Sequence, residues 1–238
     1  MKTFSLIALA LGLAGPLTLA QSSLEIPPPS APLVQKAPAN AEWTVAARLP
    51  ETQQTEPVAV TPSTSPKVDS RILLVHSTQT GKVKRDQITY ADKRQAEFWY
   101  VENWFLTTNA QGESEIYDRS VSIPAEMGEI RLSPSVTSGY PGLDWLTLGN
   151  YKSVVALEKR QAYHYDNGDY EAWIDVETKL PLAFKADGIV YTFTFNEPPV
   201  TSLTLPPGHL AAYQKVSKLM ERRRKLADDI TRQKSIQP

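Results

Sequence analysis

The chain has 238 residues, and its 25 Lys and Arg nearly balance its 26 Asp and Glu, which leaves a formal net charge of −1. This balance lacks the basic excess that holds a polyanion, so we expect no nucleic-acid partner. The absence of Cys excludes disulfides, thiolate metal ligands and thiol catalysis, so the core alone must hold the fold.

The N-terminus has the pattern of a secretory signal peptide. Lys2 supplies a positive charge, and the apolar run from Phe4 to Ala14 is too short to cross a bilayer as a stable anchor. Gly15-Pro16 ends the run, and Ala20 is the small residue that a signal peptidase needs. We therefore predict a signal peptide at residues 1–20, cleavage after Ala20, and a periplasmic or secreted mature protein without a transmembrane segment.

Residues 21–66 differ in composition from the rest of the chain. Nine prolines fall there, and Pro stiffens the backbone and removes hydrogen-bond donors, so the stretch is predicted to be a linker. An exception lies at residues 42–49, where Trp43, Val45 and Ala47 alternate with other residues as in a strand. This segment is predicted either to be the first strand or to pair with an edge of the sheet.

Residues 67–206 carry the signals of an antiparallel β domain. Asn167-Gly168 and Asp187-Gly188 favour two-residue hairpin turns, because these turns need positive φ. They predict three short strands between Tyr163 and Phe195. The predicted fold class is mainly β (α+β), with a curved, half-barrel-like antiparallel sheet and a C-terminal helix packed against it.

Two further stretches of this domain are predicted to be long strands. Glu97–Thr108 is rich in aromatic residues, and we favour one strand there over a hairpin folded at Glu102-Asn103. Tyr151–Tyr165 is the second predicted long strand.

Residues 207–238 are predicted to be a basic amphipathic helix and tail. From Leu210 to Ile230 apolar residues recur at helical spacing with no Pro or Gly between them, which predicts one helix of about twenty residues whose first half packs on the sheet. The run Arg222-Arg223-Arg224-Lys225 is typical of a solvated helix face, and contact with anionic lipid headgroups is the alternative interpretation.

No set of polar residues has the spacing of a known catalytic motif. His76, His164 and His209 lie in separate predicted elements. Two carboxylates at a suitable distance can hydrolyse glycosides, and several can hold Ca²⁺. The acids that cluster around one hairpin are Asp166, Asp169, Glu171 and Asp175. Because acids are also common in turns, we predict no catalytic residue, no metal site and no cofactor.

The aromatic residues outnumber what one thin sheet face can bury. A strand buried on one face alternates cleanly, whereas Glu97–Thr108 does not. The surplus predicts either an ordinary core or a concave lining that accepts an apolar guest.

The segment Trp173-Ile-Asp-Val-Glu-Thr-Lys-Leu-Pro181 resembles a turn of the periplasmic lipoprotein-sorting chaperone superfamily, which includes outer-membrane lipoprotein carriers. In that pattern the turn precedes a strand like Leu182-Ala-Phe184, an Asp-Gly turn and a final Tyr-x-Phe strand, and Trp99-Tyr-Val resembles a middle strand. The similarity covers residues 70–206. It implies a half-barrel with a hydrophobic hollow for acyl chains, and the motif positions that would line it are Trp99, Phe105, Trp173, Phe184, Tyr191 and Phe193.

These observations predict an exported, non-enzymatic binding module for an apolar or acylated ligand, linked to lipoprotein or envelope lipid handling. The expected partners are a lipid, an acyl chain or a lipoprotein. The alternatives are an envelope structural protein with a filled core and a protein partner, and a carboxylate-based hydrolase.

Overall fold

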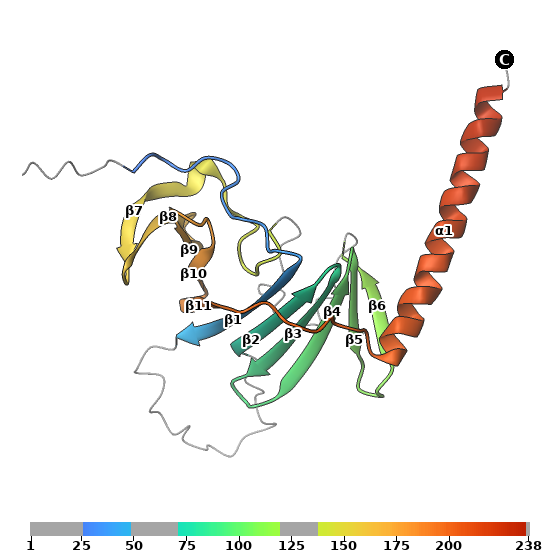
Figure 1. The fold of residues 1–238 in the computed structure, drawn as a ribbon, viewed down its shortest axis with the longest axis horizontal. Coiled ribbons are helices and arrows are strands. Elements are labelled where there is room, and N and C mark those ends of the chain that lie inside the picture. Colours follow the sequence, from blue (N-terminus) through green and yellow to red (C-terminus); the bar gives the residue numbers. More distant parts are fainter. Residues whose placement is uncertain (1–25, 49–70, 120–137, 237–238) are drawn as a thin grey trace, which may run out of the picture.

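The computed structural model describes residues 26–48, 71–119 and 138–236, which form one open antiparallel sheet and a C-terminal helix (Figure 1). The strands are β1 (Asn40–Arg48), β2 (Ile72–Thr80), β3 (Val83–Tyr90), β4 (Gln95–Val101), β5 (Trp104–Thr108), β6 (Ser114–Asp118), β7 (Tyr151–Leu157), β8 (Arg160–Asp166), β9 (Tyr170–Asp175), β10 (Pro181–Ala186) and β11 (Ile189–Asn196). Their order across the sheet is β6-β5-β4-β3-β2-β1-β11-β10-β9-β8-β7. The predicted fold class is confirmed: the protein is mainly β, with a curved antiparallel sheet and one C-terminal helix.

Strand β1 lies in the middle of the sheet, although it comes from the stretch that was expected to be a linker. Val45 pairs with Val75 on β2 and with Phe193 on β11, so β1 joins the two halves of the sheet and is not an edge segment. The residues before β1 also pack against the core through Ile26, Leu33, Val34 and Ala37. A Pro-rich stretch can do this because its side chains pack without a strand ladder. The folded part of the chain therefore begins well before residue 67.

The two expected long strands are wrong, because each is a hairpin. Glu97–Thr108 divides at Glu102 into β4 and β5, and Tyr151–Tyr165 divides at Glu158 into β7 and β8. Glu102 and Glu158 have φ values of 53° and 57°, in a left-handed region that Glu rarely enters. Neither turn contains the Gly that usually marks such a conformation, so the paired strands on both sides must hold it.

The predicted turns at Asn167-Gly168 and Asp187-Gly188 are confirmed, and they join β8 to β9 and β10 to β11. The region nevertheless contains four strands rather than three, because a third turn separates β9 from β10. Asp175 holds this turn: its Oδ1 accepts the N–H groups of Glu177 and Thr178 at 3.0 and 2.8 Å. This turn contains neither Asn-Gly nor Asp-Gly, so the sequence pattern did not mark it as a hairpin turn.

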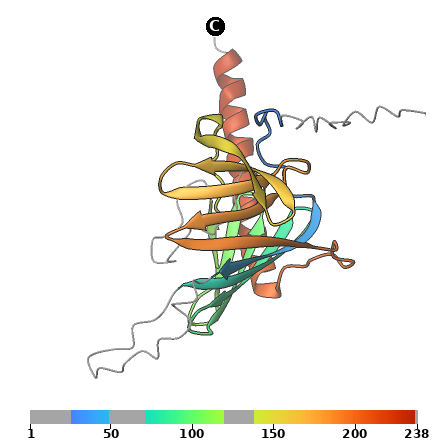
Figure 2. The ribbon, with the colours of Figure 1, turned by 90° about the vertical axis from the view of Figure 1, so that its left-hand side faces the viewer.

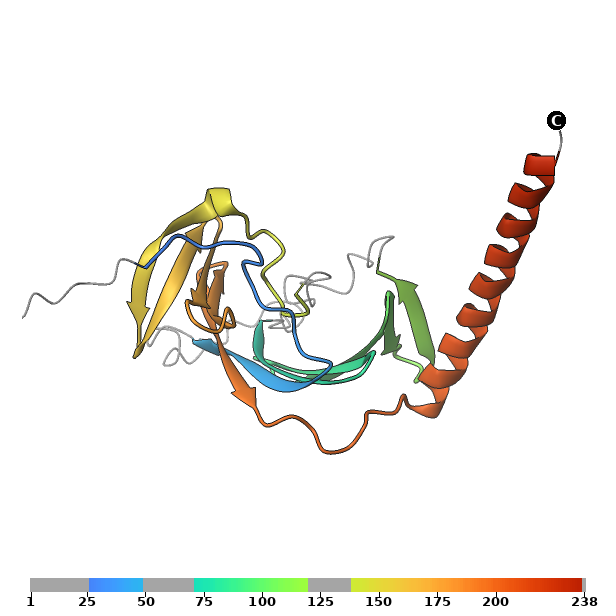
Figure 3. The same cartoon turned by 45° about the horizontal axis from the view of Figure 1, so that its top comes forward.

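The main core packs around Tyr140, in the loop that precedes β7. Figure 3 shows this loop on the concave side of the sheet. The Tyr140 ring is fully buried, with its centroid 5.1 Å from that of Trp43 and 6.0 Å from that of Phe193. The same loop passes so close to Phe184 that a Cβ on Gly142, whose φ is +73°, would lie 2.7 Å from that ring. The chain's own side chains therefore occupy this part of the concave face.

A smaller cluster lies on the opposite face of β4–β6, beneath the segment that leads from β11 into the helix. Its buried members are Trp99, Val101 and Leu106, and the residues packed against them include Trp104, Ile116, Leu203, Leu205 and Tyr213. The apolar residues of Glu97–Thr108 thus serve both faces of the sheet, which explains why that stretch does not alternate.

The C-terminal helix α1 (Pro207–Ile236) has 30 residues and is longer than expected. It contacts β6 and β5 at its beginning and then extends away from the sheet (Figures 1 and 3). Every residue from Leu219 to Arg232 is exposed. Within the described residues, no helix is both long enough and apolar enough to span a bilayer.

Candidate functional site

The six aromatic residues that the resemblance places in a hollow are distributed over both faces of the sheet. Phe184, Tyr191 and Phe193 are buried in the main core. Phe105 lies on the same face at the other end of the sheet, packed against Phe98, Tyr100 and Tyr117. Trp99 lies in the smaller cluster on the opposite face, and Trp173 lies on the outer face of β9. The structure thus brings Phe184, Tyr191 and Phe193 into ring contact within the core, and of the six residues only Trp173 presents its side chain to a described cavity on the outer face.

That cavity is a groove of about 610 Å³ on the outer face of β9–β11. These strands face the viewer in Figure 2. The apolar side chains that line it are those of Leu157, Trp173, Leu182, Ala183 and Val190. Phe193 and Phe195 border it from β11, but their side chains pack in the core on the concave face. Thr192 and Thr194 of β11 add hydroxyl groups. We call this cavity the outer groove.

Charged residues form the rim of the outer groove. Arg48 at the end of β1 donates from Nη2 to Glu158 Oε1 at 2.9 Å, although β1 and the β7–β8 turn lie on opposite sides of β9–β11 in the sheet. Arg160 Nη1 lies 3.7 Å from Asp175 Oδ2. Both guanidinium groups therefore have carboxylate neighbours. An apolar floor with a charge-balanced rim suits a ligand with an apolar body and a polar end in solvent.

The sequence pattern missed Leu157, Leu182 and Val190 as lining residues. They line one groove only because the tip of the β7–β8 hairpin reaches the end of β1, across a separation of 110 residues between Arg48 and Glu158. A local sequence pattern cannot predict a contact between residues that are so far apart in the chain.

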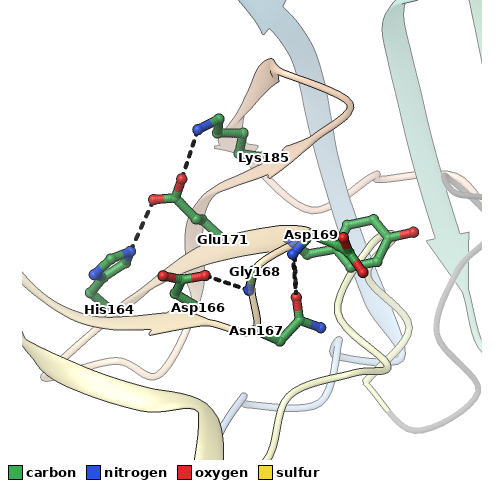
Figure 4. A network of polar contacts seen from close by, with 8 residues as sticks. His164, Asp166, Asn167, Gly168, Asp169, Glu171 and Lys185 are labelled. Carbon is green, nitrogen blue, oxygen red and sulfur yellow. Dashed lines mark hydrogen bonds and ion pairs between the residues drawn. The ribbon is translucent and has the colours of Figure 1, made fainter.

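A polar network of His164, Glu171 and Lys185 lies on the same outer face (Figure 4) and contacts Trp173 through His164. The Trp173 ring stacks on His164, with centroids 5.2 Å apart and planes 11° apart. His164 Nε2 lies 3.1 Å from Glu171 Oε2, and Lys185 Nζ donates to Glu171 Oε1 at 2.7 Å. The hydrogen bond from Lys185 lowers the pKa of Glu171. Glu171 is thus a fixed carboxylate that orients His164, and through His164 the floor of the outer groove.

The other acids near this hairpin serve its turns. Asp166 Oδ1 accepts the N–H of Gly168 at 2.7 Å, Asp175 holds the turn after β9, and Asp169 points away from Glu171 (Figure 4). In the described part of the chain, no group of three His, Asp or Glu residues is placed to hold a metal ion. The four acids therefore do not converge on a reaction centre, and no specific observation favours the hydrolase alternative.

A buried ion pair lies on the concave face of β3. Lys84 Nζ and an Asp86 carboxylate oxygen are 3.1 Å apart, and the two side chains are only 8% and 2% exposed. Ser77 Oγ donates to Asp86 Oδ1 at 2.7 Å, and Lys84 Nζ lies 5.0 Å from the centroid of the Trp43 ring. Burial lowers the pKa of Lys84, and the charge of Asp86 opposes this shift. The negative charge of Asp86 therefore offsets the cost of burying the Lys84 ammonium.

His209 joins the start of α1 to the sheet and makes this contact sensitive to pH. Its Nδ1 lies 2.8 Å from Ser114 Oγ on β6, and the residue is only 4% exposed. Burial lowers the pKa of His209 below 6.5, while the charge of Glu97 opposes the shift. The unfolded chain therefore binds this proton at a higher pH than the folded chain does.

We expect the free energy of unfolding to fall as the pH drops from about 6.5 through the lower pKa of folded His209. The variant His209→Gln should lose this part of the pH dependence, because it has no imidazole to titrate. Urea denaturation at about pH 7.5 and about pH 5 measures the difference. An equal loss of stability in the wild type and the variant would rule out His209 as its source.

Comparisons with known proteins give likenesses among solved structures alone. No family model matches the sequence, and no curated protein matches it. Among solved structures, lipoprotein LppX of Mycobacterium tuberculosis matches 69% of this chain and 88% of its own length, with 11% sequence identity and a TM-score of 0.34. A likeness of this size assigns neither a ligand nor an activity to the chain.

Proposed function

We propose that the protein is an exported, non-enzymatic binding module that takes an apolar or acylated ligand into the outer groove. Such a ligand connects it with lipoprotein or envelope lipid handling. The segment on which export depends, residues 1–20, lies outside the described residues, so export rests on the sequence pattern. The observation that carries the binding proposal is the outer groove, with its apolar floor around Trp173.

The size and chemistry of the outer groove support this proposal. Its volume of about 610 Å³ lies within the range of roughly 300–1,000 Å³ that is typical of ligand sites. Each buried methylene contributes about 0.8 kcal/mol, so roughly six methylenes contribute about 5 kcal/mol before the cost of ordering the ligand. An acyl chain can therefore bind by desolvation, without a dedicated polar contact.

The variant Trp173→Asp is expected to weaken the binding of a fluorescent fatty-acyl probe by at least about tenfold, because an apolar guest would desolvate the new carboxylate. Leu182→Asp, at a second lining position on the neighbouring strand β10, should have the same effect. Fluorescence titration measures both affinities, and far-ultraviolet circular dichroism checks that the variants fold. Phe193→Asp is a poorer test, since Phe193 is 9% exposed and contacts the Tyr140 core.

Leu74→Asp is the matched control. Leu74 is 37% exposed and lines a separate recess of about 350 Å³ together with His76 and Ile88. The control should bind the probe with unchanged affinity. Failure of the wild type to bind acyl probes, or loss of binding in Leu74→Asp with retention in Trp173→Asp, would contradict the assignment of the outer groove.

A second candidate is an envelope structural or interaction protein, and the filled core around Tyr140 favours it. In that case the functional surface lies in the N-terminal or C-terminal segments. A pull-down of an envelope protein that requires residues 21–66 or 209–238 but tolerates Trp173→Asp would support this candidate over ligand binding.

A further inference from the structure

The outer part of α1 carries an apolar stripe that no other described residue covers. Its members are Leu219, Met220, Leu226 and Ile230, which are 49, 44, 62 and 45% exposed. Leu219, Leu226 and Ile230, at spacings of seven and four residues, lie on one side of the helix, and Met220 adjoins them at the edge of that side. Helices gain most of their stability from packing an apolar face, so an exposed stripe of this length indicates a partner surface.

Basic residues accompany the stripe. The sequence of α1 contains eight Lys and Arg and three Asp and Glu, a net charge of +5 in a chain whose formal charge is −1. By helical spacing, Arg222 and Arg224 flank the stripe and Arg223 lies within it. Glu221 and Asp228 lie on the opposite side of the helix. The positive charge is therefore concentrated beside the apolar residues, and two of the three acids point away from them.

We propose that α1 docks this stripe onto an anionic lipid surface. The four apolar side chains enter the boundary between headgroups and acyl chains, and the flanking guanidinium groups bind the lipid phosphates. Arg223 fits this arrangement, because its aliphatic stem can lie among apolar groups while its guanidinium reaches the headgroups. This docking does not depend on the outer groove, which lies on distant strands at the other end of the sheet (Figure 1).

A second copy of the chain fits the stripe less well. Two α1 helices would bring the same net charge of +5 together, and Arg223 would lie inside the seam, where a coiled coil requires apolar residues. Met220 and Ala227 also widen the stripe beyond the two positions per heptad that such a seam uses. A broad apolar face with basic edges is typical of a helix that lies in a membrane interface.

Vesicle flotation with the full mature chain tests the docking. We expect binding to vesicles of phosphatidylcholine and phosphatidylglycerol at a ratio of about 7:3, and no binding to pure phosphatidylcholine. The variant Arg222→Gln/Arg224→Gln should lower the affinity by about tenfold, and higher salt should act in the same direction. Leu226→Ser/Ile230→Ser should also release the protein, because the apolar residues anchor the helix.

The charge-matched control is Lys152→Gln/Lys159→Gln, which removes two exposed positive charges from β7 and its turn and should leave vesicle binding unchanged. Two results would overturn the proposal. One is the absence of binding to anionic vesicles, or a loss in the control equal to that in Arg222→Gln/Arg224→Gln. The other is a wild-type dimer in light scattering that Leu226→Ser/Ile230→Ser converts to a monomer, which would make the stripe a seam between two chains.

Discussion

Tyr140→Ala is expected to lower the free energy of unfolding by about 3–5 kcal/mol, the range for removing a large buried aromatic side chain. The Tyr140 ring is fully buried and packs edge-on against Trp43, Phe193 and Phe195. Removing it would leave a cavity between the loop before β7 and the concave face of the sheet. Urea denaturation followed by Trp fluorescence measures the loss.

Tyr140→Phe is the control for this prediction. It keeps the ring and removes a hydroxyl for which the described residues offer no hydrogen-bond partner. Burial raises the pKa of Tyr140 to about 12, as expected for a hydroxyl that is shielded from water. This variant should be as stable as the wild type or slightly more stable. Equal losses in the two variants would mean that the ring does not fill the core in the way described.

Asp86→Asn is expected to cost about 3–5 kcal/mol of stability near neutral pH, because it leaves the Lys84 ammonium buried without a counter-charge. The loss should become smaller as the pH rises. Burial already lowers the pKa of Lys84, and without Asp86 the folded protein accommodates the neutral amine more easily than the ammonium. Urea denaturation at several pH values measures both effects.

The double variant Lys84→Met/Asp86→Asn separates the charge from the packing. Because it removes the buried ammonium, it should recover most of the stability that Asp86→Asn loses. A double variant that is as unstable as the single one would show that the loss does not come from the uncompensated Lys84 ammonium.

The sequence predicted those parts of the fold that local chemistry determines. Asn167-Gly168 and Asp187-Gly188 marked their hairpins because they reach positive φ without strain. The alternation of Tyr191, Phe193 and Phe195 with Thr192 and Thr194 sets the three aromatic side chains on one face of β11, which is the concave one. In contrast, the turns at Glu102 and Glu158 need a conformation that Glu rarely adopts, and only the pairing of whole strands enforces it.

Long-range contacts determine what the sequence could not show. The strand at residues 42–49 was recognisable from its alternation, but its place between β2 and β11 depends on partners about 30 and 150 residues away. The outer groove has the same origin. Trp173 was named from a resemblance, whereas Leu157 and Val190 join it only through the contact of two distant strand ends.

Methyl NMR of the protein labelled at Leu and Val, titrated with a medium-chain fatty acid, tests the central claim most directly. We predict that the methyl signals of Leu157, Leu182 and Val190 shift, because these residues line the outer groove. The signals of Val45 and Val75 in the filled core should stay in place. Shifts confined to Val45 and Val75, or no shifts at all, would contradict the proposal that the outer groove receives an apolar ligand.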